Sequence, residues 1–417
     1  MRELFGIRDY RLIWTGQAVS NSGDALTNLA LLLTTQRLTG STAAVATTAI
    51  AIALPTLLFG FVAGAYVDRW NRKRVMIVSD LFRTSFVLAF LLVTTVDRMW
   101  VLYVVAFIQA SLGTFFSPAK SAYLPRIVGP DHLMSANSVS QMTQIVFGLI
   151  GTAIAGVIAA FNDTLALAYI IDAATFLVSL AAISLVRTDA SPQRTADVET
   201  TILADIGVGL RVLSESRLLR GVLLGAGVMM LGLGAVNVLL VPLIVDDLMV
   251  PETWFAGFEG AQVVSMIAAS AITASLAKRF GTTNLIVAGV VGISISVAAM
   301  STVQAPWQMV VILFLVGWAI APLQASAATL VQTEVDDSVR GRTGSALNTV
   351  LTGANVVSMA FAGTLAAGIG VRNVFLVSGA IGIVAAGLAA LMFTGAVPKA
   401  DTMHLSSRPE PAVAPAE

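Results

Sequence analysis

The sequence predicts an all-α integral membrane protein with twelve transmembrane helices, arranged as two pseudo-symmetric halves of six helices each. Composition is the first observation behind this prediction, because 57% of the 417 residues are hydrophobic and only 12% are charged. The second is a mean hydropathy of +0.86. The third is a series of apolar stretches close to the ~20 residues that an α-helix needs to cross a bilayer. A soluble chain of this length would need far more charged surface.

Apolar stretches separated by polar or turn-forming segments define the expected spans. The first six lie at residues 11–36, 43–67, 75–96, 100–118, 135–160 and 164–187. The second six lie at residues 217–245, 254–279, 283–303, 307–331, 343–368 and 373–394. We therefore expect an N-terminal half at 1–187, a cytoplasmic linker at 188–216, a C-terminal half at 217–395 and a disordered cytoplasmic tail at 396–417.

The distribution of basic residues predicts the orientation of these helices. If the N-terminus is cytoplasmic, only Arg37, Arg98 and Arg372 among the 24 Lys and Arg residues fall in outer loops, and Arg83 lies within a span. Basic residues near helix ends stay on the cytoplasmic side of a membrane. The sequence therefore predicts a multi-pass protein with both termini in the cytoplasm.

Several classes of function find no support in the residues. Cysteine is absent, which excludes disulfides and thiol catalysis. No Gly-x-x-x-x-Gly-Lys-Ser/Thr pattern for ATP binding occurs. Neither of the two histidines, His132 and His404, has a nearby ligand set for a metal. The formal net charge is zero, which gives no reason to expect nucleic acid as a partner. We expect neither an enzyme nor a bound cofactor or metal.

A dense basic segment between the second and third spans carries the most specific pattern. It resembles the Gly-x-x-x-Asp-Arg-x-Gly-Arg-Lys signature of the major facilitator superfamily. The matching residues are Gly64, Asp68, Arg69, Arg72 and Lys73. Asn71 occupies the position of the usual second glycine, and we expect it to preserve a turn of positive φ, which asparagine tolerates better than most residues.

Three further segments are similar to the bacterial drug-exporter branch that includes macrolide efflux proteins and the enterobactin exporter. They are residues Ser20–Asp24, Phe116–Ala119 with Leu124–Arg126, and Asp172–Phe176. One departure concerns the fifth span, where Thr152 follows Gly151 instead of the proline that many proton antiporters carry.

This resemblance implies a secondary active transporter of a bacterial inner or plasma membrane. It would export a hydrophobic or amphipathic small molecule, such as a drug or macrolide-like compound, by alternating access and proton antiport. The expected partners are the small-molecule substrate, protons and the lipid bilayer, and the expected state is a monomer. A siderophore exporter, a proton-coupled importer and a non-transporting membrane receptor remain alternatives.

The resemblance also implies a conformational latch formed by Gly64, Asp68, Arg69 and Arg72. Asp68 would contact the inner end of the eleventh span in the outward-facing state, and the two arginines would hold it there. The alternative is that the basic residues only fix the topology. Gly60 and Gly64 lie four residues apart, a spacing that allows close approach of a neighbouring helix.

Four carboxyl groups lie within expected spans, where an unpartnered charge costs about 2.5 to 3.5 kcal/mol on insertion scales. Asp24 is the first candidate for binding a proton or a cationic substrate, and a packing hydrogen bond is its alternative. Glu259 is the second candidate, and its alternative is a hydrated carboxylate at the membrane–water interface. Asp80 and Arg83 lie three apart on one helix face, which favours a neutralised pair over a proton relay. Asp172 is a further candidate for proton coupling or substrate binding, and the alternative, which the resemblance favours, is a structural contact beside Thr175.

Amides and one aromatic side chain within the spans are candidates for a substrate cavity. They are Gln109, Gln144, Asn237, Gln262 and Trp318. Amides in membrane helices also serve as hydrogen-bonding contacts between helices, so packing is the alternative for each.

Overall fold

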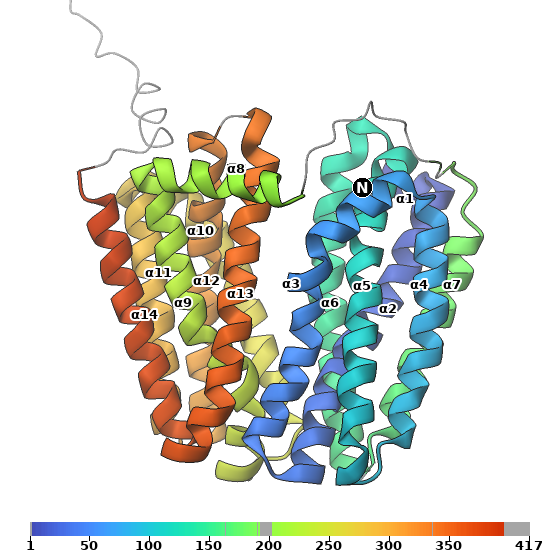
Figure 1. The fold of residues 1–417 in the computed structure, drawn as a ribbon, viewed down its shortest axis with the longest axis horizontal. Helices are drawn as coiled ribbons and strands as arrows, with labels where there is room; N and C mark the ends of the chain where they lie inside the picture. Colours follow the sequence, from blue (N-terminus) through green and yellow to red (C-terminus); the bar gives the residue numbers. More distant parts are fainter. Residues whose placement is uncertain (1, 163, 190, 192–201, 336, 396–417) are drawn as a thin grey trace, which may run out of the picture.

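The structure is a computed structural model that describes all residues except 1, 163, 190, 192–201, 336 and 396–417. The described residues form helices and connecting turns without strands (Figure 1). The first half contains α1 (Arg2–Gly6), α2 (Arg8–Thr39), α3 (Thr42–Arg69), α4 (Arg72–Val87), η1 (Leu88–Leu92), η2 (Val96–Arg98), α5 (Met99–Val128), α6 (Pro130–Phe161) and α7 (Ala166–Ser184). The second contains α8 (Ile202–Glu215), α9 (Arg217–Pro242), the π-helical turn η3 (Leu243–Asp247), α10 (Trp254–Phe280), α11 (Thr282–Ala299), η4 (Met300–Thr302), α12 (Pro306–Glu334), α13 (Asp337–Ile369) and α14 (Val371–Phe393).

Eleven of the described helices are long and apolar enough to cross a membrane. The remaining expected span is α2, which has 32 residues and contacts α6 and α7 within the first bundle. The polar side chains of α2 include Gln17, Asn21 and Asp24. The all-helical membrane fold is thus confirmed, and α2 is one of the helices that bring polar groups into it.

Helix ends follow local sequence signals. Gly40 ends α2 with a φ of 58°, and its N–H donates to the carbonyl of Gln36 at 2.8 Å. Ser41 then caps α3 by accepting a hydrogen bond from the Ala44 N–H. Gly281 and Gly370, with φ of 83° and 84°, make equally short turns between antiparallel helices.

Two connecting segments contain helix that the sequence did not predict. The fourth span does not end at Pro118, because α5 continues through Pro118 and Pro125 to Val128, and α6 begins one residue after Gly129. The 188–216 segment is not simply a linker, since α8 forms within it. In Figure 1, α8 lies across the end of the second bundle. The predicted disordered tail, 396–417, lies outside the described residues.

The two bundles share a core at only one end of the molecule. We call the end with α1 and α8 the N-terminal face and the other end the opposite face (Figure 1). The largest buried cluster joins residues of both halves, such as Leu33 of α2 and Ile244 of η3. At the N-terminal face, each half instead has its own cluster, one around Tyr123 and one around Leu213. The halves are therefore packed together at the opposite face.

Candidate functional site

A cavity of about 600 Å³ lies between the two halves. Its apolar walls include Met230, Phe255 and Phe258, together with aliphatic residues of α2, α9 and α12. Its polar lining residues are Asn28, Thr152, Asn237, Glu259, Gln262 and Asn355. Small-molecule sites in proteins have this size and this composition, an apolar wall with a few polar groups that fix orientation. We call this space the central cavity.

Glu259 of α10 is the only charged residue among the described residues that line the central cavity. Its Oε2 atom is buried and makes no hydrogen bond within the part of the chain that the structure describes. An unpartnered buried carboxyl oxygen is costly, which makes this group a candidate for contact with a ligand donor. The central cavity thus contains one carboxyl group with an oxygen that the described residues leave unpaired.

A second cavity of about 490 Å³ lies within the first half, between α2, α3, α4, α5 and α7. Asp24, Arg83, Gln109 and Asp172 line it. Asn28, one turn from Asp24 on α2, lines both this cavity and the central one. The two spaces therefore adjoin at this α2 side chain.

Arg83 is the centre of a polar network in this second cavity. Its guanidinium forms an ion pair with the Asp24 carboxylate, and its side chain is only 12% exposed. The guanidinium carbon also lies 4.1 Å from the centroid of the Phe176 ring. Gln109 donates from Nε2 to the Arg83 carbonyl at 2.9 Å. Asp24 and Phe176 thus contact the Arg83 guanidinium, Gln109 binds the backbone of the same residue, and Asp24 compensates the charge.

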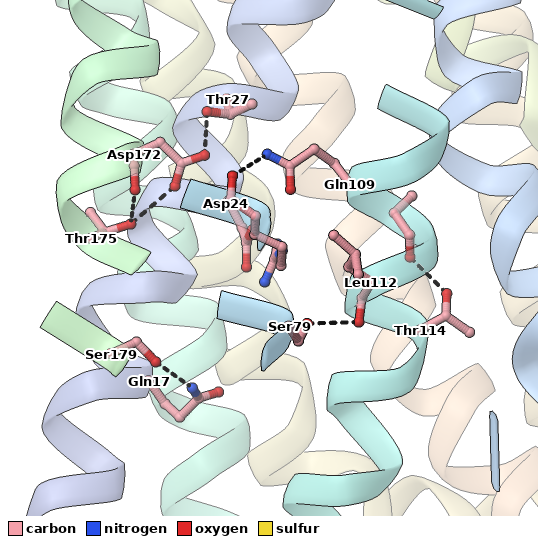
Figure 2. A network of polar contacts seen from close by, with 12 residues as sticks. Gln17, Asp24, Thr27, Ser79, Gln109, Leu112, Thr114, Asp172, Thr175 and Ser179 are labelled. Atoms are coloured by element: carbon pink, nitrogen blue, oxygen red, sulfur yellow. Dashed lines mark hydrogen bonds and ion pairs between the residues drawn. The ribbon is translucent and has the colours of Figure 1, made fainter. Parts of the chain in front are cut away.

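Asp172 of α7 is buried and accepts two side-chain hydrogen bonds, which Figure 2 shows. Thr27 donates to Oδ2 at 2.6 Å and Thr175 to Oδ1 at 3.0 Å. The predicted contact beside Thr175 is present. Gly23 makes this approach of α2 to α7 possible, because a Cβ there would collide with the Asp172 carboxylate and the Thr175 hydroxyl.

Asp80 does not form the predicted neutralised pair with Arg83. Arg83 is paired with Asp24 on the neighbouring helix α2 instead. Asp80 is fully buried near the Ser179 hydroxyl and the Arg83 charge, but it forms no ion pair with Arg83 among the described residues. Spacing on one helix could not reveal this, because the competing carboxylate comes from another helix.

Polar contacts between the halves lie at the opposite face, and we call them the opposite-face seal. Arg37 at the end of α2 forms an ion pair of 2.6 Å with Glu252, which lies before α10. It also donates to the carbonyls of Ala159 at 2.6 Å and Asn162 at 2.9 Å. Gln36 donates to Asp246. The ion pair and the Gln36 hydrogen bond both join the first half to the second.

Glycines bring the backbones of the two halves together in the same region. A Cβ on Gly156 of α6 would lie 2.7 Å from the Glu252 carbonyl oxygen. A Cβ on Gly363 of α13 would lie 3.1 Å from the Thr42 carbonyl oxygen. Larger side chains at either position would force the halves apart.

Comparison with known proteins decides the family. The sequence profile of the transmembrane secretion effector family, a branch of the major facilitator superfamily, matches residues 5–416. The chain belongs to this family. It is 29% identical to the uncharacterized MFS-type transporter YfiS of Bacillus subtilis over 377 residues, 88% of each chain. It is 26% identical to macrolide efflux protein A of Streptococcus pyogenes over 384 residues, 88% of this chain and 92% of that one.

A solved structure supports the fold of this transporter. The crystal structure of the nucleoside transporter NupG has a TM-score of 0.76 at 12% identity, covering 92% of this chain and 99% of that one. Structural similarity at such low sequence identity supports the fold and does not indicate the substrate. This member of the transmembrane secretion effector family is therefore a multi-pass membrane transporter of the major facilitator type.

The family signature of this transporter adopts a different turn from the one expected. Asn71 has a φ of −68° and not a positive φ, and it caps α4 by accepting a hydrogen bond from the Arg74 N–H at 3.1 Å. Asparagine is favoured at the N-cap of a helix because its side-chain oxygen accepts a hydrogen bond from a backbone N–H of the first turn. Arg72 is buried, whereas Arg69 is exposed. The Asp68 side chain lies outside what the structure describes, so the latch remains a prediction.

Two glycines of α3 have no packing role among the described residues. No described atom lies within 4 Å of a Cβ placed on Gly60 or Gly64, so the predicted close approach of a neighbouring helix is absent. Gly60 lines the second cavity instead, where the missing side chain leaves space.

The predicted cavity residues divide into three groups. Asn237 and Gln262 line the central cavity, as expected, and Gln109 lines the second cavity. Gln144 is exposed and lines neither. Trp318 was wrongly expected in the cavity: it is 40% exposed and stacks on Phe314. Trp318 lies two residues from Val316 and from Ile320, which line the cavity. Two residues along an α-helix correspond to a rotation of about 200°, so Trp318 points away from the cavity.

Sequence reasoning missed the seal and one half-buried cation. Arg37, Glu252 and Asp246 were not singled out, although Arg37 is one of three basic residues in expected outer loops, which was a usable signal. Lys120 of α5 lines a small pocket with Tyr10 and forms no ion pair among the described residues. Lys120 was not singled out because it lies near the expected end of a span, where basic residues ordinarily set the topology.

Proposed function

We propose that this transporter exports a hydrophobic or amphipathic small molecule, of the drug or macrolide-like kind, in exchange for protons. The observation that carries the proposal is the central cavity with its single charged group, Glu259, whose Oε2 is buried without a partner among the described residues. A site that must hold either a proton or a substrate donor on one carboxylate couples the two by competition.

The N-terminal face is the cytoplasmic face in this proposal. Arg37, Arg98 and Arg372 lie at the opposite face, and few other basic residues do, in agreement with the charge rule for membrane proteins. With the opposite-face seal closed, the structure then corresponds to the inward-open state, which loads substrate from the cytoplasm. Opening the seal and closing the N-terminal face would complete the cycle by rocking of the two halves.

The lining of the central cavity supports a bulky, mostly apolar substrate with hydrogen-bonding groups. Methionine and phenylalanine side chains such as Met230 and Phe258 adapt to different apolar shapes. Amides such as Asn237 and Gln262 provide donors and acceptors without adding charge. Macrolide efflux protein A, a relative across most of the chain, supports this class of substrate.

Glu259 is our proposed proton carrier, in preference to Asp24, the first candidate from sequence. Asp24 is already paired with Arg83 within the first half, whereas the Glu259 Oε2 has no partner among the described residues. We assign the Asp24, Arg83 and Asp172 network the role of fixing α2 against α4 and α7. Because Asn28 borders both cavities, α2 provides a mechanical connection between that network and the substrate.

Transport into proteoliposomes tests the proposal. Purified protein should accumulate a radiolabelled macrolide when the lumen is acidic relative to the outside, since protons then leave as substrate enters. Protein-free liposomes correct for passive trapping of a basic drug. Accumulation driven by an acidic exterior would indicate an importer, and transport indifferent to the gradient would overturn proton coupling.

A further inference from the structure

An apolar groove of about 500 Å³ lies at the N-terminal face, away from both cavities already described. It is formed by the end of α3, the first turns of α4 and the middle of α5, and α5 lies between α3 and α4 in Figure 1. The lining residues that matter here are Trp70, Arg74, Val75, Val78, Leu112 and Phe115. All but Arg74 present apolar surface, and the two polar residues that also line the groove, Asn71 and Ser79, are hydrogen-bonded to the Arg74 N–H and the Leu112 carbonyl.

Aromatic rings form one wall of this groove. The Trp70 ring stacks on Phe115, with 6.5 Å between centroids, and Tyr66 packs against Trp70 at 5.2 Å. Trp70 and Val78 are 46% and 48% exposed. Tryptophan favours the level of the lipid headgroups, so the groove starts at the membrane surface and extends toward the hydrocarbon.

Arg74 is the only basic residue among the described residues that line this groove. Lys73 donates to the carbonyls of Ser184 at 2.8 Å and Val186 at 2.7 Å, which fixes it to the end of α7. Arg72 is buried. The Arg74 side chain is exposed, and its guanidinium makes no hydrogen bond or ion pair with the described part of the chain. A cation thus lies at the mouth of an apolar channel.

We propose that this groove binds an anionic phospholipid of the leaflet at the N-terminal face. The phosphate contacts Arg74, and one acyl chain lies along Val75, Val78, Leu112 and Phe115. Charge complementarity selects this occupant, because the groove offers one cation at the headgroup level and apolar surface below it. Anionic headgroups attract basic residues at this depth.

The charge is tested by native mass spectrometry of the purified protein with palmitoyl-oleoyl phosphatidylglycerol. Arg74→Gln should weaken binding of the first lipid about fivefold, which corresponds to about 1 kcal/mol per basic residue near an anionic surface. Arg220→Gln is the matched control, since Arg220 is also an exposed arginine in the first turn of a helix at the N-terminal face. It should bind the lipid as the unmodified protein does.

The groove is tested separately from the charge. Val78→Trp should fill the channel and displace the lipid while Arg74 stays in place. Leu81→Trp is the control, because Leu81 is equally exposed on α4 but does not line the groove. Glycerol 3-phosphate, which carries the phosphate without acyl chains, should not compete. Equal lipid binding by Arg74→Gln, or equal loss in the Arg220→Gln or Leu81→Trp control, would overturn the proposal.

Discussion

Replacing Glu252 by glutamine should open the opposite-face seal. Glu252 accepts a charged hydrogen bond of 2.6 Å from Arg37, with side chains 16% and 24% exposed. The Arg37 bonds to the carbonyls of Ala159 and Asn162 lie within the first half and survive the substitution. Only the ion pair between the halves is weakened, so the change acts on the conformational equilibrium.

The magnitude follows from the chemistry of that one bond. Hydrogen bonds to charged groups contribute roughly 1.5–3 kcal/mol, and neutral ones roughly half as much. Glutamine keeps a neutral acceptor, so Glu252→Gln should cost the sealed state about 1 kcal/mol. That loss corresponds to about a fivefold rise in the ratio of open to sealed molecules.

Spin labels at Asp97 and Gln304 measure this ratio by double electron–electron resonance. Both residues are exposed at the opposite face, one in each half, and the chain has no cysteine of its own to interfere with labelling. Glu252→Gln should increase the population at long distance. Asp247→Asn is the control, because Asp247 pairs with Arg372 within the second half. An unchanged distance distribution, or an equal change in the control, would refute the role of the seal.

Three further predictions concern the buried groups and the seal. Glu259→Gln should abolish macrolide accumulation driven by a pH gradient but retain exchange of labelled for unlabelled macrolide, as measured in proteoliposomes; loss of both would indicate a binding role alone. Arg83→Gln should leave the Asp24 carboxylate uncompensated and lower the free energy of unfolding by about 2 kcal/mol. Thermal unfolding in detergent measures this, and adding Asp24→Asn should restore part of the loss. Gly156→Val should shift the spin-label distances in the same direction as Glu252→Gln, because even its Cβ would lie 2.7 Å from a backbone oxygen of the other half.

The membrane fold could be predicted because apolar length is a local property of the sequence. Eleven of the twelve expected spans correspond to described helices that are long and apolar enough to cross a membrane, and the boundary that differs most is that of α5, which continues past Pro118. Proline favours a helix end in water, but a helix that is packed along most of its length tolerates it. The amphipathic helix α8 was not predicted, because the polar residues that flank it indicated a linker.

Site residues could be predicted from sequence where a polar side chain within an apolar span was sufficient to indicate them. Glu259, Asn237 and Gln262 reach the central cavity for that reason. Pairings were not predictable, because they depend on which helices are neighbours. Arg83 pairs with Asp24, 59 positions away, and not with Asp80 on its own helix. Arg37 and Glu252, 215 positions apart, meet only because the two halves close at one face.

The central claim is that substrate and proton compete for Glu259, and proton release on binding tests it most directly. A macrolide added to the purified protein in weakly buffered detergent solution, with a pH-indicator dye, should release protons. We expect Glu259→Gln to bind the macrolide without that release. No release from the unmodified protein at saturating macrolide, or equal release from Glu259→Gln, would contradict the account.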